Sequence, residues 1–177
     1  MGIFITVMKK RPDKFKMQMK MNGMTIMEQI YNGEKGKVAS PQGAQMMTGE
    51  ELEEMKYSAS LFNELSYLED GYTVELVGIE DLNGTEAYKM TVTNPLGSKT
   101  TEYYAVNTGL KLREVKTEET PQGEFTQITD YSGYTATPHG VKFPEKMIMN
   151  IGGQEMTFTL EEAKVNSAVA DSEFTIE

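Results

Sequence analysis

Few side chains in this sequence are of the types that carry out acid–base or nucleophilic chemistry. The chain has 177 residues, a single histidine (His139) and no cysteine. Thiolate nucleophiles, disulfides and cysteine-based zinc sites are therefore excluded, and zinc sites that need a pair of histidines on one helical face cannot be built. His139 lies between Pro138 and Gly140, which predicts a loop, and no GxSxG motif accompanies it. We interpret His139 as a loop residue rather than a catalytic base.

Carboxylates are the remaining candidates for catalysis. The adjacent pair Glu161 and Glu162 would point to opposite faces of a strand and would not converge on one substrate. Phosphate-binding glycine motifs and calcium-binding loops are absent from the sequence. The sequence therefore predicts no enzyme, no catalytic residues, no metal site and no cofactor, and an enzyme built on carboxylate pairs is kept only as an alternative.

Charge and hydropathy exclude further classes. With 17 Lys+Arg against 27 Asp+Glu, the net charge of -10 argues against nucleic acid as a partner, because phosphate binding needs an excess of basic residues. No apolar run approaches the ~18 residues that predict a membrane span. Residues 1–40 are locally basic, with eight basic and three acidic groups. Lysines there would protect an edge strand or face anionic lipid or an acidic partner, and we favour protection.

The candidate binding residues lie on strands. Every second residue of segment 14–21 is apolar, namely Phe15, Met17, Met19 and Met21, which predicts a half-buried strand. Asn22-Gly23 then favours a type I′ hairpin that would pair Met19 with Ile26 and Met17 with Glu28. Glu28 becomes the polar exception on an apolar face. It would either orient a ligand's polar end or lie in water at the rim, and the cost of burying a charge favours the rim.

Three further turn signals predict a long antiparallel meander with one wet and one dry face. They are Asn83-Gly84, Asn107–Gly109 and Gly152-Gly153. The predicted dry faces are Val77, Ile79, Tyr88, Met90 and Val92 in the second hairpin, Tyr104, Val106, Leu110 and Leu112 in the third, and Met147, Met149, Ile151, Met156, Phe158 and Leu160 in the last. The register of the strand after Gly123 stays open.

A helix interrupts the meander. Thr48 with Glu51 forms a capping-box pattern, and apolar residues at helical spacing continue to Leu68. We expect a helix over 48–70, broken near residues 58–60. The tail after residue 165 is expected to turn and bury Phe174 and Ile176.

The helix is too narrow to cover the sheet that the hairpins predict. They place 22 apolar side chains on inward faces, whereas a ~20-residue helix is ~30 Å long and 10–12 Å wide. Apolar surface left over at this scale marks a binding site. We therefore expect a mainly β (α+β) fold, with a single curved antiparallel sheet forming an unclosed half-barrel and a helix over its concave face.

Methionine content points to the nature of that site. The chain has 14 Met and no Trp, and methionine lines apolar surfaces that repack around varied guests. The alternative is that these residues fill an irregular core. The predicted lining residues are Phe15, Met17, Met19, Met21, Ile26, Met147, Met149, Met156 and Phe158 on strands, and Phe62 and Leu65 on the helix.

A series of short motifs follows the same order as in a known group. They are KFKMQMKM (14–21), YNGEKG (31–36), the helix after TGEEL, GIEDLNGTEAYKMTV (78–92), EYYAVNTGLKLREV (102–115), YSGYTATPHGVKFPEKMIM (131–149) and VNSAVADSEFTI (165–176). Together they resemble the bacterial lipoprotein-carrier superfamily of periplasmic LolA-type carriers and LolB-type acceptors. The pattern GVKFP is the most telling of them.

The resemblance implies an unclosed antiparallel barrel with helices over a cavity for acyl chains, in the periplasm or cell envelope. We divide the chain into a leader at 1–13 and a carrier-like domain at 14–177. The implied function is non-enzymatic binding of an acyl chain or another apolar ligand, with lipid or an acylated protein as partner. Similar domains also look like C-terminal appendages of insulinase-type zinc peptidases. The alternative is therefore an accessory interaction domain of a larger envelope protein, with no ligand of its own.

Overall fold

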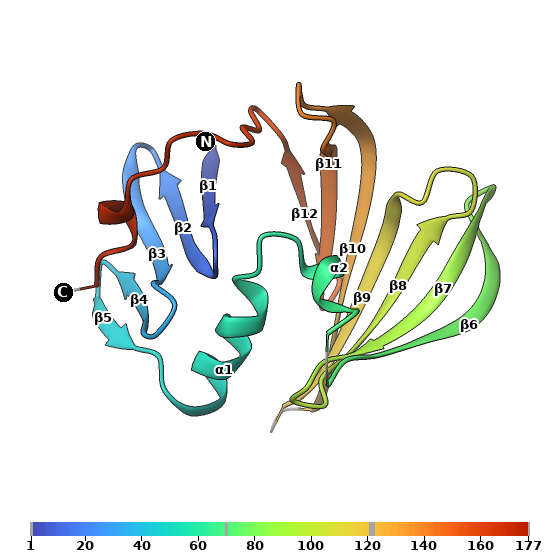
Figure 1. The fold of residues 1–177 in the computed structure, drawn as a ribbon, viewed down its shortest axis with the longest axis horizontal. Coiled ribbons are helices and arrows are strands. Elements are labelled where there is room, and N and C mark those ends of the chain that lie inside the picture. The colour runs from blue at the N-terminus through green and yellow to red at the C-terminus, as the bar shows by residue number, and fades with distance from the viewer. Residues whose placement is uncertain (1, 70, 121–122, 177) are drawn as a thin grey trace. The chain divides into compact units, whose positions relative to one another are not determined.

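The computed structural model describes residues 2–69, 71–120 and 123–176. The chain divides into two compact units, formed by residues 1–66 with 168–177 and by residues 67–167. Each unit is built on one antiparallel sheet with two open edges (Figure 1). The predicted class, mainly β with unclosed antiparallel strands, is confirmed. The strands form two sheets rather than the single one expected.

The sheet of the first unit has five strands in sequence order. They are β1 (Ile3–Lys10), β2 (Lys14–Met21), β3 (Met24–Tyr31), β4 (Gly36–Ser40) and β5 (Gly43–Met46). The predicted type I′ turn joins β2 to β3, since Asn22 and Gly23 both have positive φ, at 52° and 79°. β1 pairs with β2 along its whole length. Residues 3–10 of the predicted leader are therefore part of this sheet.

The helical segment is shorter than predicted. α1 (Gly49–Ser58) and α2 (Asn63–Ser66) replace the expected helix over 48–70, and the break falls at the predicted place. Thr48 is the N-cap of α1, but its side chain makes no capping hydrogen bond. The break has a local cause, because the Ser60 hydroxyl bonds the Phe62 carbonyl and the Ser66 hydroxyl. Serine side chains that bond nearby polar groups compete with helical hydrogen bonds.

The sheet of the second unit has seven strands, ordered β12-β11-β10-β9-β8-β7-β6. They are β6 (Thr73–Leu82), β7 (Thr85–Thr93), β8 (Lys99–Ala105), β9 (Lys111–Thr120), β10 (Gly123–Ala136), β11 (Lys142–Ile151) and β12 (Gln154–Thr159). β10 is the strand whose register the sequence left open. It pairs Ile128 with Val115 of β9 and Tyr131 with Met147 of β11. The turn between β9 and β10 includes residues 121–122, which lie outside the described part of the chain.

Bulges change the predicted register in three hairpins. In the first hairpin, β2 and β3 shift by one residue beyond Lys20 and Thr25, so Met19 lies opposite Met27 and Ile26 is left without a partner. The predicted pairs of Met19 with Ile26 and Met17 with Glu28 are therefore wrong. The same irregularity displaces Val77 in β6 and Leu112 in β9. Strict alternation cannot reveal an inserted residue, since each bulge moves all later side chains to the other face.

The bulge between β2 and β3 resolves the position of Glu28. Its cross-strand partner is Gln18, which donates to Glu28 Oε2 at 2.8 Å, and Lys16 Nζ lies 3.8 Å from the same oxygen. Glu28 thus lies on the face of β2 that carries the lysines, opposite to the methionines. It is not a polar exception on an apolar face.

The chain's C-terminal segment covers this lysine face. The short helix η1 (Asp171–Phe174) packs against β2. Lys14 donates to Asp171 at 2.7 Å and Lys16 donates to Glu173 at 2.9 Å. The predicted burial of Phe174 is confirmed, with 1% of the residue exposed. The lysines of β2 do not protect an edge, because β2 lies between β1 and β3.

These ion pairs make the C-terminal segment sensitive to acid. Hydrogen bonds from Lys14 and Lys10 lower the pKa of Asp171 below its ordinary 3.8, and the bond from Lys16 lowers the pKa of Glu173 below 4.5. A lowered carboxyl pKa gives stability that is present above the ordinary value and is lost as pH falls through the lowered one. We expect the ring NMR signals of Phe174 to keep their native shifts down to about pH 4 and to change below it, as the neighbouring ion pairs are lost.

The double variant D171N/E173Q is the control for this titration. Its amides keep the shape of the carboxyls but do not titrate, so its Phe174 signals should show no transition in that range. Native shifts retained to pH 2 in the unmodified protein would contradict the prediction.

Candidate functional site

The first sheet carries an apolar face built from β1 and β2, which we call the first methionine face. The register pairs Ile3 with Met21, Ile5 with Met19 and Val7 with Met17, and directly paired residues share a face. The full set on these two strands is Ile3, Ile5, Val7, Phe15, Met17, Met19 and Met21. The structure therefore brings four predicted lining residues together, whereas Ile26 lies at the bulge of β3.

Lys9 ties the helical segment to one end of this face. It lies opposite Phe15, and its Nζ is 5.9 Å from the centre of the Phe15 ring. Its ammonium donates to the carbonyls of Ser58 at 3.0 Å and Ser60 at 2.7 Å. Ser58 is the last residue of α1, whose final carbonyls have no partner within the helix, and Ser60 follows the C-cap Ala59. Burial lowers the pKa of Lys9, and the nearby carboxylate of Glu64 opposes that shift.

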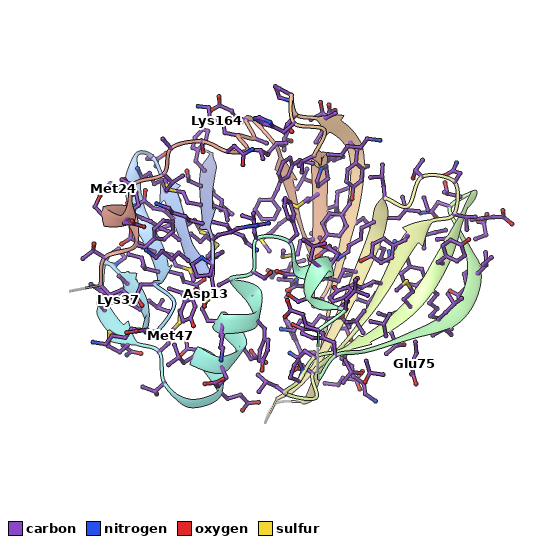
Figure 2. All side chains as sticks on the ribbon, in the orientation of Figure 1. Asp13, Met24, Lys37, Met47, Glu75 and Lys164 are labelled. Atoms are coloured by element: carbon purple, nitrogen blue, oxygen red, sulfur yellow. The ribbon has the colours of Figure 1, made fainter. Side chains whose placement is uncertain are left out.

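The helices do not form a packed cover. No residue of α1 is buried. Of the two predicted helical lining residues, Phe62 is half-buried in the link before α2, and Leu65 is 61% exposed. Met47, labelled in Figure 2, precedes α1 and is buried against Gly36 of β4. The segment is thus anchored at Met47, at the lysine contact and at the buried Ala59 and Ser66, whereas α1 itself buries no residue.

The second sheet carries a second methionine face at its β11–β12 end. β11 and β12 pair Met147 with Phe158 and Met149 with Met156, as the sequence predicts. Met147 and Met156 are 37% and 42% exposed, so these two side chains are partly open to solvent. β10 extends the same face with Tyr131 opposite Met147 and Thr129 opposite Met149.

A polar strip that the sequence reasoning missed crosses the middle of this face. Glu102 of β8 lies directly opposite Glu114 of β9, and Lys111 Nζ bridges them at 3.3 Å and 3.2 Å. Tyr67 donates to Glu102 Oε1 at 2.5 Å, and the hydroxyl of Tyr104 donates to Oε2. The signal was present, because alternation places Glu102 on the same face as Tyr104, two residues later.

Beyond this strip the face becomes apolar again. The register places Leu76 opposite Met90 and Ile79 opposite Tyr88. Leu76 and Ile79 are exposed and lie on β6, at the edge of the sheet. Val77, which was predicted to share the face of Ile79, is displaced by the bulge, and Leu76 lies opposite Met90 instead.

The opposite face of the second sheet is mixed, since it carries apolar residues together with ion pairs. The apolar residues are Ala87, Tyr103, Ala105, Val115, Ile128 and Ile148. Arg113 holds Asp130 through two hydrogen bonds of 2.6 Å and 2.9 Å. Lys89 pairs with Glu80 at 2.9 Å. The predicted division into a wet and a dry face is therefore only partly found in this sheet, because both faces carry apolar residues and ion pairs.

Other features of the described residues give less support for a binding site than the two methionine faces do. A hollow of about 370 Å³ lies at the β4–β5 hairpin, lined by Val38, Ser40 and residues 42–45, and contains none of the predicted lining residues. His139 is exposed in the turn between β10 and β11. Within the described ranges, no three His, Asp or Glu side chains gather as metal ligands would. No helix among those residues has the length and hydropathy to cross a bilayer.

Comparison with known proteins finds solved structures with a similar fold. No family model matches the chain, and no curated protein sequence matches it significantly. Among solved structures, it is similar to a LolA superfamily protein from Nitrosomonas europaea, with a TM-score of 0.66 and 14% identity over 97% of this chain and 80% of that one.

Two further structures are comparably similar. One is a putative outer membrane lipoprotein-sorting protein domain from Vibrio parahaemolyticus, with a TM-score of 0.64 and 11% identity over 96% of this chain and 79% of that one. The other is a DUF1329 family protein from Desulfovibrio piger, with a TM-score of 0.64 and 16% identity over 98% of this chain and 80% of that one. The resemblance drawn from the sequence motifs is thereby confirmed at the level of structure: this chain has the fold of the LolA superfamily.

Proposed function

We propose that this chain is a non-enzymatic binding domain of the bacterial cell envelope that holds an acyl chain or another apolar ligand on its methionine faces. Lipid or an acylated protein is the proposed partner, and the periplasm is the proposed compartment. The fold supports this proposal, since one of the similar structures is named as a lipoprotein-sorting domain and another as a LolA superfamily protein.

The observation that carries the proposal is the imbalance between apolar residues and cover. Nine apolar residues are buried among the described ones, whereas 17 large apolar residues are exposed by a third or more. Several of these share a face with half-buried methionines, as Ile3, Ile5 and Val7 do with those of β2. Continuous exposed apolar surface of this kind marks an interaction site, and each hydrocarbon contact there would contribute about 25 cal/mol per Å² before ordering costs.

Native mass spectrometry of gently purified protein tests the function directly. We expect a population whose mass exceeds the polypeptide by that of a co-purified lipid, removable by organic extraction and restored by adding a long-chain fatty acid. A bare polypeptide mass, with no uptake of added lipid, would contradict ligand binding and would favour the accessory interaction role.

A matched pair of substitutions on β12 tests the location. M156D places a charge on the second methionine face, whereas T157D places the same charge on the next residue, which points to the opposite face. Burial of a methionine side chain contributes about 1.5–3 kcal/mol, and each 1.4 kcal/mol is a factor of ten in affinity.

We therefore expect M156D to weaken uptake of a fluorescent fatty acid by at least about tenfold. T157D should leave uptake within about twofold of the unmodified protein. Equal effects of the two variants, at unchanged far-UV circular dichroism, would show that the ligand does not lie on this face.

A further inference from the structure

The polar strip on the second sheet has one saturated and one available carboxylate. Glu102 is 1% exposed, and its two oxygens accept from Tyr67, Tyr104 and Lys111, with Thr100 Oγ1 at 3.4 Å. A carboxylate with this many donors has no capacity left for a ligand. Glu102 therefore organises the strip and is not itself a binding group.

Glu114 and Tyr131 have hydrogen-bonding capacity that the described residues do not use. Among the described residues, the only partner of Glu114 is Lys111, which contacts Oε2 and leaves Oε1 open, and the side chain is 27% exposed. The Tyr131 hydroxyl makes no hydrogen bond with any described group. Burial and the neighbouring charge of Glu114 raise the pKa of Tyr131, so the hydroxyl stays neutral and is able both to donate and to accept.

These two groups border the second methionine face. Thr129 is the cross-strand partner of Glu114 on one side and of Met149 on the other, and Tyr131, two residues further along β10, lies opposite Met147. A molecule with its head at Glu114 and Tyr131 would have its chain over β11 and β12. The polar strip is therefore adjacent to the second methionine face, as the polar head of an amphiphile is adjacent to its hydrocarbon chain.

We propose that Glu114 and Tyr131 form a head-group subsite for an amphiphile whose head donates hydrogen bonds, as an ammonium or a hydroxyl group does. The subsite rests on the proposed function, because the hydrocarbon chain of the same ligand would lie on Met147 and Met149. The ammonium or hydroxyl donates to Glu114 Oε1, and the Tyr131 hydroxyl bonds the head's oxygen where it has one.

The surrounding charges discriminate against an anionic head. The charges that act on the Tyr131 hydroxyl are the carboxylates of Glu114 and Glu102 and the ammonium of Lys111. Lys111 is already shared between the two carboxylates. Lys116, the next residue of β9 on this face, has a partner of its own. A carboxylate or phosphate head would therefore find Tyr131 as its donor but would also face the open carboxylate oxygen of Glu114. The like charges would repel each other.

Three probes with the same chain and different heads test the subsite: dodecylamine, dodecanol and dodecanoate. Each competes with a fluorescent fatty acid on delipidated protein at pH 7.5 and 150 mM salt, below its micelle concentration or, for dodecanol, below its solubility limit. We expect the ammonium and the hydroxyl probes to bind at least about tenfold more tightly than dodecanoate. Both probes donate a hydrogen bond to the charged carboxylate of Glu114, whereas the carboxylate of dodecanoate is repelled by it.

Two conservative variants and a charge-matched control locate the effect. E114Q should reduce the preference for dodecylamine over dodecanoate to less than about threefold, and Y131F should reduce the preference for dodecanol. E124Q removes the same charge from an exposed position of β10 and should keep the full preference. Far-UV circular dichroism and melting temperature verify that each variant is folded.

The outcomes separate the subsite from the function on which it rests. Tight binding of all three probes alike, or a preference that persists in both E114Q and Y131F, would overturn the subsite and leave the apolar ligand in place. Failure of every probe to bind the unmodified protein would overturn both. A preference lost equally in E124Q would assign it to the net charge of the protein and would also overturn the subsite.

Discussion

Replacing Glu102 with alanine should lower the free energy of unfolding by about 3–5 kcal/mol, because removing one member of a buried ion pair leaves its partners without compensation. The substitution takes away the shared acceptor of Tyr67, Tyr104 and Lys111. Two hydroxyls and an ammonium would then have to find new partners in a region from which water is excluded. Urea unfolding followed by circular dichroism measures the loss.

Glutamine at the same position separates charge from shape. E102Q retains one acceptor oxygen but turns an amide donor toward the tyrosine hydroxyls. We therefore expect it to lower the free energy of unfolding by less than E102A does, about 1–3 kcal/mol. E155A, on the exposed polar face of β12, should change stability by no more than about 0.5 kcal/mol. If E102A lowers the free energy of unfolding by less than about 1 kcal/mol, the polar strip does not stabilise the second unit.

Phe174→Ala is the second substitution with a large expected effect, about 3–5 kcal/mol. Phe174 is 1% exposed and belongs to η1, which packs on the lysine face of β2. Truncation removes the apolar anchor of the C-terminal segment and leaves a cavity that the short helix cannot fill. The ion pairs of Asp171 and Glu173 lie at the surface and would not hold the segment alone.

Hydrogen exchange gives this prediction a spatial readout. F174A should accelerate exchange in β2 and β3 of the first unit, whereas E102A should do so in β8 and β9 of the second, because each residue belongs to one unit. F174L, which conserves most of the volume, should cost less than about 1.5 kcal/mol, and T175A, at an exposed neighbour, should be nearly neutral. Equal acceleration in both sheets after F174A would show that the segment stabilises more than its own unit.

The hairpins could be predicted because their information is local. Asn22-Gly23 selects its turn through the two residues themselves, and the face of Met147, Met149, Met156 and Phe158 follows from alternation on either side of Gly152-Gly153. The break in the helix is also local, since Ser60 makes hydrogen bonds within a few residues.

The register of the first hairpin could not be predicted from local sequence patterns. One extra residue at Ile26 moves Glu28 from the methionine face to the lysine face. The lysines that looked like protection for an edge are partners of Asp171 and Glu173, which lie more than 150 residues away. A contact of that separation leaves no trace in local periodicity.

The sequence by itself determined the class of fold, the turns, the alternation within single strands and the chemistry that is excluded, because alternation, turn residues and composition act over a few neighbouring positions. Only the tertiary structure decided that the strands divide into two sheets, that the C-terminal segment covers β2, and that Glu102, Lys111 and Tyr67 meet on one face. Those outcomes depend on which distant strands pair and in what register, and pairing is decided by the free energy of the whole assembly of side chains rather than by any one segment.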